Sequence, residues 1–283
     1  MKEHTNRHRV AKMASIFGVS RSGYYAWTKR EPSTHAQEDR ELEGLIRRIF
    51  DDHRKRYGSP RVWEALKGQG RRISRKRVER LMREHHLRSK RCRKSVFTTN
   101  SSHHLEVAEN ILNRTFSASG AGEKWVSDIT YVRTKEGWLY VTVILDLWDR
   151  KVIGWSMSKE LTAEQTCRAL DMAVRNRPPR EGLIFHSDRG VQYCSEEFRS
   201  ALKRFCPTVV QSMSRKGNCW DNACAESFFK TLKDELDELD GNHRYKEVKT
   251  AIFEYIEMYY NRCRRHSALG YATPIALTPT NAA

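Results

Sequence analysis

The stretch WVSDITYV (residues 125–132) decides the fold, because it places the acid Asp128 inside an apolar, β-branched run typical of a buried strand. The same pattern recurs in FHSDRGVQY (185–193), where Asp188 follows an apolar run. A third acid, Glu226, opens an amphipathic helix in DNACAESFFKTLK (221–233). An ionised carboxylate in a buried strand is costly unless it is paired or binds a metal, so these acids predict a functional site.

Three carboxylates of this kind favour a magnesium-type centre. Mg²⁺ is commonly held by one or two carboxylates together with substrate phosphate oxygens, and two such ions can clamp an in-line phosphoryl displacement. We therefore interpret Asp128, Asp188 and Glu226 as candidate catalytic residues and metal ligands for chemistry on nucleic acid.

The residues around these acids predict an α/β domain over 125–283. Strands are expected at 125–133, 138–146, 151–157, 182–187 and 208–213, and helices at 162–175, 195–206, 222–238 and 245–262. Three hairpin-linked strands followed by strand–helix alternation predict a mixed five-stranded sheet flanked by helices, the layout of an RNase H-like fold. If the first and fourth strands are neighbours, Asp128 and Asp188 lie side by side.

The charge of the chain is unevenly distributed. The formal net charge is +17, and residues 1–124 carry 29 Lys and Arg against 14 Asp and Glu, whereas the remaining residues carry 23 against 21. A basic N-terminal portion joined to a nearly neutral body predicts a nucleic-acid-binding arm on a catalytic domain.

The arm divides into three predicted parts. Residues 1–35 form a short helix-turn-helix-like segment, in which Ser20 can cap a second helix. Residues 36–94 form a basic three-helix DNA-binding domain, and residues 95–124, rich in Ser, Thr and Gly, form a linker.

The third helix of this domain carries the strongest basic signal. Between residues 71 and 94 there are twelve basic residues and two acids, Glu79 and Glu84. Such a run is often only a solvated face, but its single sign favours DNA contact. The candidate contacts are Arg75, Lys76, Arg77 and Arg80.

Other classes of protein are disfavoured. The longest apolar run, VTVILDLW (141–148), is too short to span a bilayer, so no membrane association is expected. The seven cysteines show no CxxC spacing, which indicates reduced thiols in an intracellular protein rather than a zinc site.

Six segments resemble one family closely. They are similar to the second open reading frame of the insertion-sequence-three (IS3-type) family, which encodes a transposase with a retroviral-integrase-type core. The resemblance extends over nearly the whole chain and implies a bacterial, cytoplasmic, nucleoid-associated protein. The segments are GVSRSGYYAW (18–27), YGSPRVWEAL (57–66), WVSDITYV (125–132), FHSDRGVQY (185–193), SMSRKGNCWDNACAESFFKTLK (212–233) and YYNRCRRHSALGYATPIA (259–276).

This resemblance implies a DDE transposase, a polynucleotidyl transferase that cuts and joins DNA in transposition. It implies that Asp128, Asp188 and Glu226 bind two Mg²⁺ or Mn²⁺ ions. A water or a 3′-hydroxyl then attacks a DNA phosphodiester with no covalent enzyme intermediate. The alternative is a catalytically inert end-binding protein or repressor of transposition.

The spacing departs from the family pattern. Thirty-seven residues separate Asp188 from Glu226, two more than is usual, and strict spacing would land on Cys224. A soft thiol is a poor Mg²⁺ ligand, so the ESFF context favours Glu226, with Asp221 as the alternative third ligand.

Further residues surround the expected site. Lys230 and Lys233 follow Glu226 on one helical face, so they favour DNA contact over a surface ion pair, and the resemblance supports Lys233. Arg215 and Lys216, in a Gly-containing loop, suit phosphate contacts, although the loop could be a plain connector. Asp146 could support the site, and His186 could either support it or merely pack.

The resemblance also implies partners. These are double-stranded DNA (terminal inverted repeats and target DNA), further copies of the chain on paired ends, and the upstream-frame protein as a fusion or partner. On this interpretation the chain lacks the main end-recognition domain, which a frameshift fusion would supply.

Overall fold

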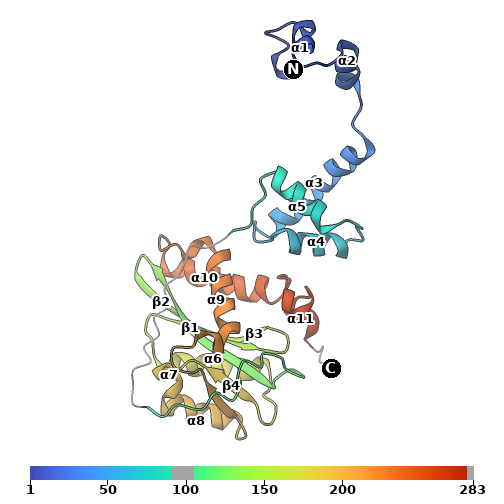
Figure 1. The fold of residues 1–283 in the computed structure, drawn as a ribbon. Coiled ribbons are helices and arrows are strands. Elements are labelled where there is room, and N and C mark those ends of the chain that lie inside the picture. Colours follow the sequence, from blue (N-terminus) through green and yellow to red (C-terminus); the bar gives the residue numbers. More distant parts are fainter. Residues whose placement is uncertain (91–104, 279–283) are drawn as a thin grey trace. The chain divides into compact units, whose positions relative to one another are not determined.

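The computed structural model describes residues 1–90 and 105–278, and it divides into two units, 1–89 and 90–283. The first unit contains only helices, and they are α1 (Val10–Ile16), α2 (Arg21–Lys29), α3 (Thr34–Asp52), α4 (Ser59–Gly68) and α5 (Arg75–Glu84), after a 3₁₀ turn at Lys2–His4 (Figure 1). This arrangement confirms a helical N-terminal region. The domain boundaries over 1–35 and 36–94 remain a proposal.

Short capping residues start these helices where the sequence predicts. Ser20 accepts a hydrogen bond from the Gly23 N–H at the start of α2, and Ser74 accepts one from the Arg77 N–H at the start of α5. At α4 the residue before the helix is Gly58, and Ser59 is the first helical residue. The apolar stripes of α3, α4 and α5 then meet in a small core that includes Ile46, Phe50, Val62, Leu66, Val78 and Leu81.

The second unit contains a mixed five-stranded sheet. Its strands are β1 (Lys124–Thr134), β2 (Gly137–Asp146), β3 (Val152–Ser158), β4 (Ile184–Ser187) and β5 (Val210–Met213). The order is β3-β2-β1-β4-β5. The pairs β1–β2 and β2–β3 are antiparallel, and the pairs β1–β4 and β4–β5 are parallel. This topology confirms the predicted RNase H-like sheet, in which the first and fourth strands are neighbours.

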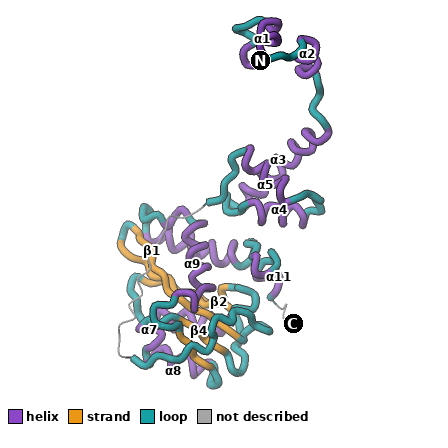
Figure 2. The backbone as a smooth tube through the Cα atoms, viewed as in Figure 1, coloured by secondary structure: helices purple, strands orange, loops and turns teal. Residues whose placement is uncertain are grey.

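Helices cover both faces of the sheet, which forms one layer of strands between them (Figure 2). They are α6 (Ala163–Asn176), α7 (Val191–Cys194), α8 (Glu196–Phe205), α9 (Ala223–Glu235), α10 (Tyr245–Glu254) and α11 (Pro274–Leu277), and a π-helical segment, Tyr255–Tyr260, continues α10. Short 3₁₀ turns lie at Cys219–Asn222, Asp237–Leu239 and Ser267–Leu269.

Two apolar cores hold these layers together. One core joins the sheet to α9 and α10 through Val126, Val143, Phe228, Leu232 and Ile252. The other joins the opposite face to α6 and α8 through Trp125, Ile144, Leu170, Phe185 and Phe198. Gly154 lets α6 approach β3, because a Cβ there would lie 2.2 Å from the carbonyl oxygen of Ala169.

The segment 105–123 differs from the expected linker. Leu112 is fully buried in the core beside α9, and the main-chain N–H groups of Ile111 and Leu112 donate to the Ser212 hydroxyl on β5. This part of the segment is therefore packed against the sheet. The Ser- and Gly-rich composition predicted a linker because it gives no local sign that Leu112 is buried or that the main chain around it is hydrogen-bonded to β5. The earlier part, 91–104, lies outside the described residues.

Candidate active site

Asp128 and Asp188 meet at the same level of β1 and β4. Val126 pairs with His186 in parallel register, and each acid follows its paired residue by two positions. Each carboxylate also accepts a main-chain N–H close by, from Ile129 at 2.8 Å and from Gly190 at 2.9 Å. The strand register therefore brings the two predicted acids together.

Glu226 approaches these acids from the first turn of α9. The apolar side chains Phe228, Phe229 and Leu232 bury the opposite face of this helix, as the sequence predicts. The turn before the helix is fixed by the Asn222 side-chain amide, which donates to the Ser127 carbonyl at 3.0 Å. Ser127 directly precedes Asp128, so this bond ties the start of α9 to the acid-bearing strand.

The three acids interact electrostatically. Burial raises the pKa of Asp128 well above its usual value, and the negative charges of Asp188 and Glu226 raise it further. Burial also raises the pKa of Glu226. All three side chains stay partly exposed, so the site gathers negative charge at a solvent-accessible edge.

Lys233 is the cation that the structure brings to this site. Its positive charge opposes the rise in the Asp128 pKa, and its Nζ lies 5.8 Å from the centre of the Tyr131 ring. Lys230 is fully exposed one turn earlier on α9. The predicted pair is therefore split between one lysine beside the acids and one at the surface.

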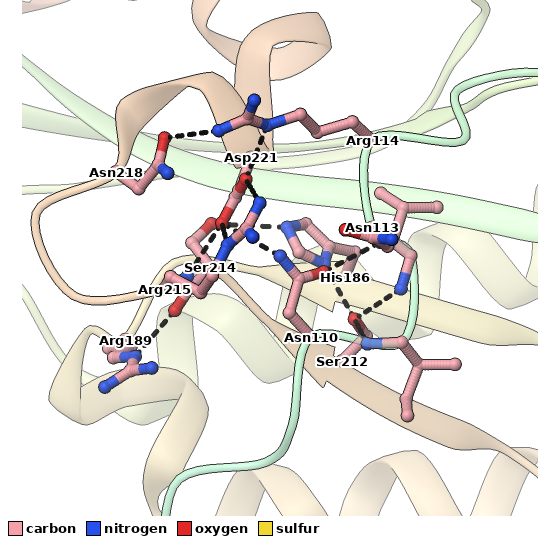
Figure 3. A network of polar contacts seen from close by, with 12 residues as sticks. Asn110, Asn113, Arg114, His186, Arg189, Ser212, Ser214, Arg215, Asn218 and Asp221 are labelled. Carbon is pink, nitrogen blue, oxygen red and sulfur yellow. Dashed lines mark hydrogen bonds and ion pairs between the residues drawn. The ribbon is translucent and has the colours of Figure 1, made fainter.

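Asp221, the alternative third ligand, is engaged in a network of hydrogen bonds and ion pairs (Figure 3). The buried carboxylate accepts hydrogen bonds from the Arg215 guanidinium and main chain, from Asn110 and from Arg114. These partners hold the pKa of Asp221 well below its usual range, with the Arg215 side chain as the largest cause. The carboxylate of Asp221 is thus occupied by bonds within the fold, whereas the charge of Glu226 contributes to the raised pKa of Asp128.

The same network includes Arg215, which the sequence analysis predicted to contact DNA phosphates. Arg215 places its guanidinium on Asp221 at 2.7–2.8 Å, whereas Lys216 is exposed beside it. The loop 214–222 is therefore held by internal ion pairs. Lys216 is exposed, and the Arg215 side chain, although bound to Asp221, is also 49% exposed.

His186 lies buried beneath this loop (Figure 3). Burial lowers its pKa to about 4, so the ring is neutral near pH 7. Its Nδ1 lies 2.9 Å from the Ser212 hydroxyl and its Nε2 lies 3.2 Å from the Ser214 hydroxyl. The Ser212 oxygen already accepts two main-chain N–H groups, so we infer that the Ser212 hydroxyl donates its hydrogen bond to Nδ1 of His186. Nδ1 is then the acceptor, and the proton of the neutral ring is on Nε2. His186 packs and cross-links β4 to β5.

Asp146 is not part of the site, which corrects the expectation that it could support the acids. It pairs with Trp125 in the β1–β2 register, three positions from the pairing of Asp128 with Val143, so the two acids point to opposite faces. Arg177 bridges Asp146 and Asp149 at 2.7–2.9 Å, and all three are buried. Asp149 is therefore a buried ion-pair partner as well as a turn residue.

Cys224 confirms the argument against a thiol ligand. Its sulfur lies 2.6 Å from a guanidinium nitrogen of Arg150, and burial raises its pKa.

The basic residues of α5 fall into two groups. Arg75 and Lys76 are exposed at the start of the helix. Arg77 and Arg80 instead place their guanidinium groups on Asp39 of α3, at 2.7 and 2.6 Å. The charge run is therefore part surface and part structural ion pair.

Two residues of the site were missed by the sequence reasoning. The hydroxyl of Tyr193, on α7, lies 2.7 Å from that of Ser127, and the charges of Asp188 and Asp128 add to the effect of burial in raising its pKa. The Tyr193 hydroxyl is therefore bonded to the residue that precedes Asp128. Arg114 was missed because nothing in its local sequence marks its bond to Asp221, 107 positions away.

No group of three His, Cys, Asp or Glu side chains in residues 1–90 and 105–278 is arranged to hold a metal ion. In the same residues, no helix has both the length and the apolar character needed to cross a membrane.

Known proteins are similar to this chain over most of its length. Integrase core domain models match residues 118–219 and 208–274, and an HTH-like domain model matches residues 36–95. The insertion element IS600 uncharacterized 31 kDa protein of Shigella sonnei is 46% identical over 265 residues, covering 93% of this chain and 96% of that protein. Transposase InsF for insertion sequence IS3A of Escherichia coli (strain K12) is 42% identical over 278 residues, covering 97% and 95%.

Solved structures include a retroviral counterpart. The HTLV-2 integrase catalytic core domain in complex with magnesium is 19% identical, with a TM-score of 0.42, and the match covers 55% of this chain and 94% of that one.

Proposed function

The chain belongs to the IS3 family of transposases, and from this premise we propose that Asp128, Asp188 and Glu226 catalyse cleavage and strand transfer at the DNA ends of an insertion sequence. The observation that carries the proposal is the register of β1 and β4, which sets Asp128 beside Asp188 while α9 brings Glu226 to the same edge.

Each step of the proposed reaction forms one P–O bond and breaks one P–O bond. In cleavage, the oxygen of a water attacks the phosphorus, a new P–O bond forms, and the bond to the leaving 3′-oxygen breaks. The water loses a proton and the 3′-oxygen gains one. In strand transfer, the freed 3′-hydroxyl replaces water as the nucleophile, and the target strand releases its own 3′-hydroxyl.

The residues fit a divalent cation. They offer hard carboxylate oxygens. Burial raises the pKa of Asp128, and the negative charges of Asp188 and Glu226, which a cation would offset, raise it further. Two Mg²⁺ or Mn²⁺ ions held by the three acids would supply Lewis-acid stabilisation of the charge that develops on the phosphate. A ready-made three-ligand cage is not required, because Mg²⁺ accepts one or two carboxylates and completes its shell with substrate oxygens and water.

The protein's own part in the reaction is positioning. The N–H groups of Ile129 and Gly190 fix one oxygen of each strand acid, and the amide of Asn222 fixes the start of the helix that bears Glu226. Lys233, beside Asp128, is placed to pair with a DNA phosphate next to the reacting one. Further exposed cations are proposed DNA contacts, namely Lys216 and Lys230 in the catalytic unit and, separately, Arg75 and Lys76 in the helical unit.

Partners form part of the proposal. We expect copies of the chain to act together on paired terminal inverted repeats and target DNA, with the upstream-frame protein as a fusion or partner. Strand transfer by the chain alone, compared with the fused form, tests this requirement.

The central experiment is strand transfer of pre-cleaved, labelled ends of the insertion sequence in Mg²⁺, comparing wild type with Glu226→Gln. Loss of joined product with retained DNA binding supports the assignment. The matched control is Glu254→Gln, the same change at an exposed glutamate of α10, which should join ends normally. Joining by Glu226→Gln would refute the catalytic role. Binding without joining by wild type would favour an inert end-binding protein.

A further inference from the structure

Trp220 is an exposed tryptophan directly followed by two buried residues. Its side chain is 70% exposed, whereas the next two residues, Asp221 and Asn222, are 0% and 4% exposed. Burial of a large aromatic side chain is energetically favourable. Its exposure at a well-bonded position therefore indicates a ligand that covers it. Single exposed apolar residues are common on protein surfaces, and the argument therefore rests on how this one is held.

The turn that carries Trp220 is fixed on both sides. Asp221 accepts bonds from Arg215 and Arg114, and Arg114 also donates to the Asn218 side chain at 3.0 Å (Figure 3). Asn222 donates to the Ser127 carbonyl. The indole is thus presented by bonds that its neighbours make, so covering it requires little ordering of the chain.

The turn that carries Trp220 is bonded to the strand that bears Asp128 and leads directly into α9, which bears Glu226. Trp220 lies two residues before Asn222, whose side chain is bonded to the residue that precedes Asp128. The cations nearest in the loop are Arg215 and Lys216, so the surroundings favour a polyanion over an apolar protein surface. The occupant most consistent with this setting is a nucleobase.

We propose that Trp220 is a stacking site for an unpaired nucleobase of the DNA end held at the acids. This inference rests on the proposed function and goes beyond it, because it assigns a base-binding site outside the catalytic acids. A base within a duplex has both faces covered by its neighbours, so the ring takes a base that is frayed or already single-stranded. Trp220 thereby holds the end open next to the phosphate that reacts.

The test measures binding of a labelled DNA duplex that ends in a three-nucleotide single-stranded overhang, with 2-aminopurine placed at each overhang position in turn. A blunt duplex of the same sequence is the reference. The protein is the full chain carrying Glu226→Gln, with Ca²⁺ present, so that no DNA is consumed.

The stacking site predicts quenching of 2-aminopurine at one overhang position. It also predicts that Trp220→Ala removes the quenching and weakens binding of the overhang duplex by about tenfold, within the usual range for one base stacked on an aromatic ring. Binding of the blunt duplex should change less than about twofold. Trp220→Phe, which keeps an aromatic face, should retain most of the quenching.

The matched control is Trp138→Ala. Trp138 is also exposed, at 47%, but it lies on the β1–β2 hairpin and packs edge-on against Tyr131, with ring centres 5.1 Å apart. This variant should bind and quench like the parent protein. Unchanged quenching and affinity in Trp220→Ala would overturn the stacking site, and so would a loss seen only in Trp138→Ala.

The two proposals fail separately. Catalysis is read from joining of ends by Glu226→Gln, whereas stacking is read from fluorescence in a protein that does not need to react. Thermal unfolding of Trp220→Ala should match that of the parent, because the side chain is exposed and the bonds of Asp221 and Asn222 remain.

Discussion

Asp128 and Asp188 lie side by side because Val126 pairs with His186 and each acid follows two residues later on a parallel strand. The cost of this arrangement is visible in the raised pKa of Asp128. Burial and two neighbouring negative charges both oppose its ionisation, so the apoprotein carries electrostatic strain at the site where a cation is expected.

Asp128→Asn should therefore stabilise the metal-free protein while abolishing strand transfer. The folded-state pKa of Asp128 is raised, so its ionisation destabilises the fold, and this penalty grows as pH rises from the unfolded value through the folded one. At pH 7.5 we expect a rise in Tm of roughly 2–4 °C, the shift that about 1 kcal/mol produces in a domain of this size.

Scanning calorimetry in EDTA measures this effect, with Glu254→Gln as the control that should leave Tm unchanged. Added Mg²⁺ or Mn²⁺ should raise the Tm of wild type and have little effect on Asp128→Asn, because binding to the folded state alone is stabilising. A lower Tm for Asp128→Asn in EDTA would contradict the strain argument.

Gly190→Ala should impair Asp188 without unfolding the domain. A Cβ at Gly190 would lie 3.0 Å from Oδ1 of Asp188 and 3.1 Å from Oε1 of Gln192, and the backbone there, at φ −60°, accepts alanine. The carboxylate must shift by a few tenths of an ångström, so we expect at least about tenfold less strand transfer, since small misplacements of reacting groups are costly.

Joining rates and Tm measured together separate the two effects. The control is Gly44→Ala on α3, where an added Cβ meets no atom within 4 Å and helix propensity favours alanine. Wild-type joining by Gly190→Ala would show that the position of Asp188 tolerates the contact.

The sequence predicted the acids because they are marked by local patterns. Asp128 and Asp188 interrupt β-branched runs, and Phe228 and Leu232 set the helical face opposite Glu226. Hairpin lengths and strand–helix alternation then predicted a mixed sheet, whereas the pairing of β1 with β4 was a condition of the prediction that the structure supplies. These signals act over a few residues, so a single sequence reveals them.

The ion pairs could not be predicted in this way. Arg77 looks like any member of a basic run, and its partner Asp39 lies 38 residues earlier on another helix. Arg114 and Asp221 likewise meet only when the segment 105–123 packs on the sheet. Partner choice among many charges depends on tertiary packing, which charge patterning does not encode.

Asp221→Asn should destabilise the catalytic body in a pH-dependent manner. The buried carboxylate accepts bonds from two arginines that are about half exposed, so we expect a loss of about 2 kcal/mol, in the range for hydrogen bonds to charged groups. Its pKa is lowered in the folded state. The stabilisation is therefore fully present above the unfolded value and is lost as pH falls towards the folded one.

Urea unfolding between pH 3 and 8 measures this difference. The gap in unfolding free energy between wild type and Asp221→Asn should be constant from pH 5 to 8 and should narrow below pH 4. Asp240→Asn, at an exposed acid, is the control with a small effect. A gap that widens in acid would contradict the role assigned to Asp221.

Substitutions at Arg75 and Arg77, two positions apart on α5, should affect different properties, DNA binding in the first case and stability in the second. Arg75 and its neighbour Lys76 are exposed, whereas Arg77 is bonded to Asp39 and Glu38. If the exposed pair contacts phosphates, Arg75→Ala/Lys76→Ala should weaken DNA binding and reduce the salt dependence of log K by about 2, one unit for each lost contact.

Arg77→Ala should instead lower the stability of the three-helix region, because it leaves the partly buried Asp39 with one fewer donor. Its salt dependence of binding, measured by fluorescence anisotropy at temperatures where the variant is folded, should stay near that of wild type. A salt slope reduced by Arg77→Ala and unchanged by the double variant would reverse the assignment. The DNA surface of α5 would then lie on the Asp39 side of the helix.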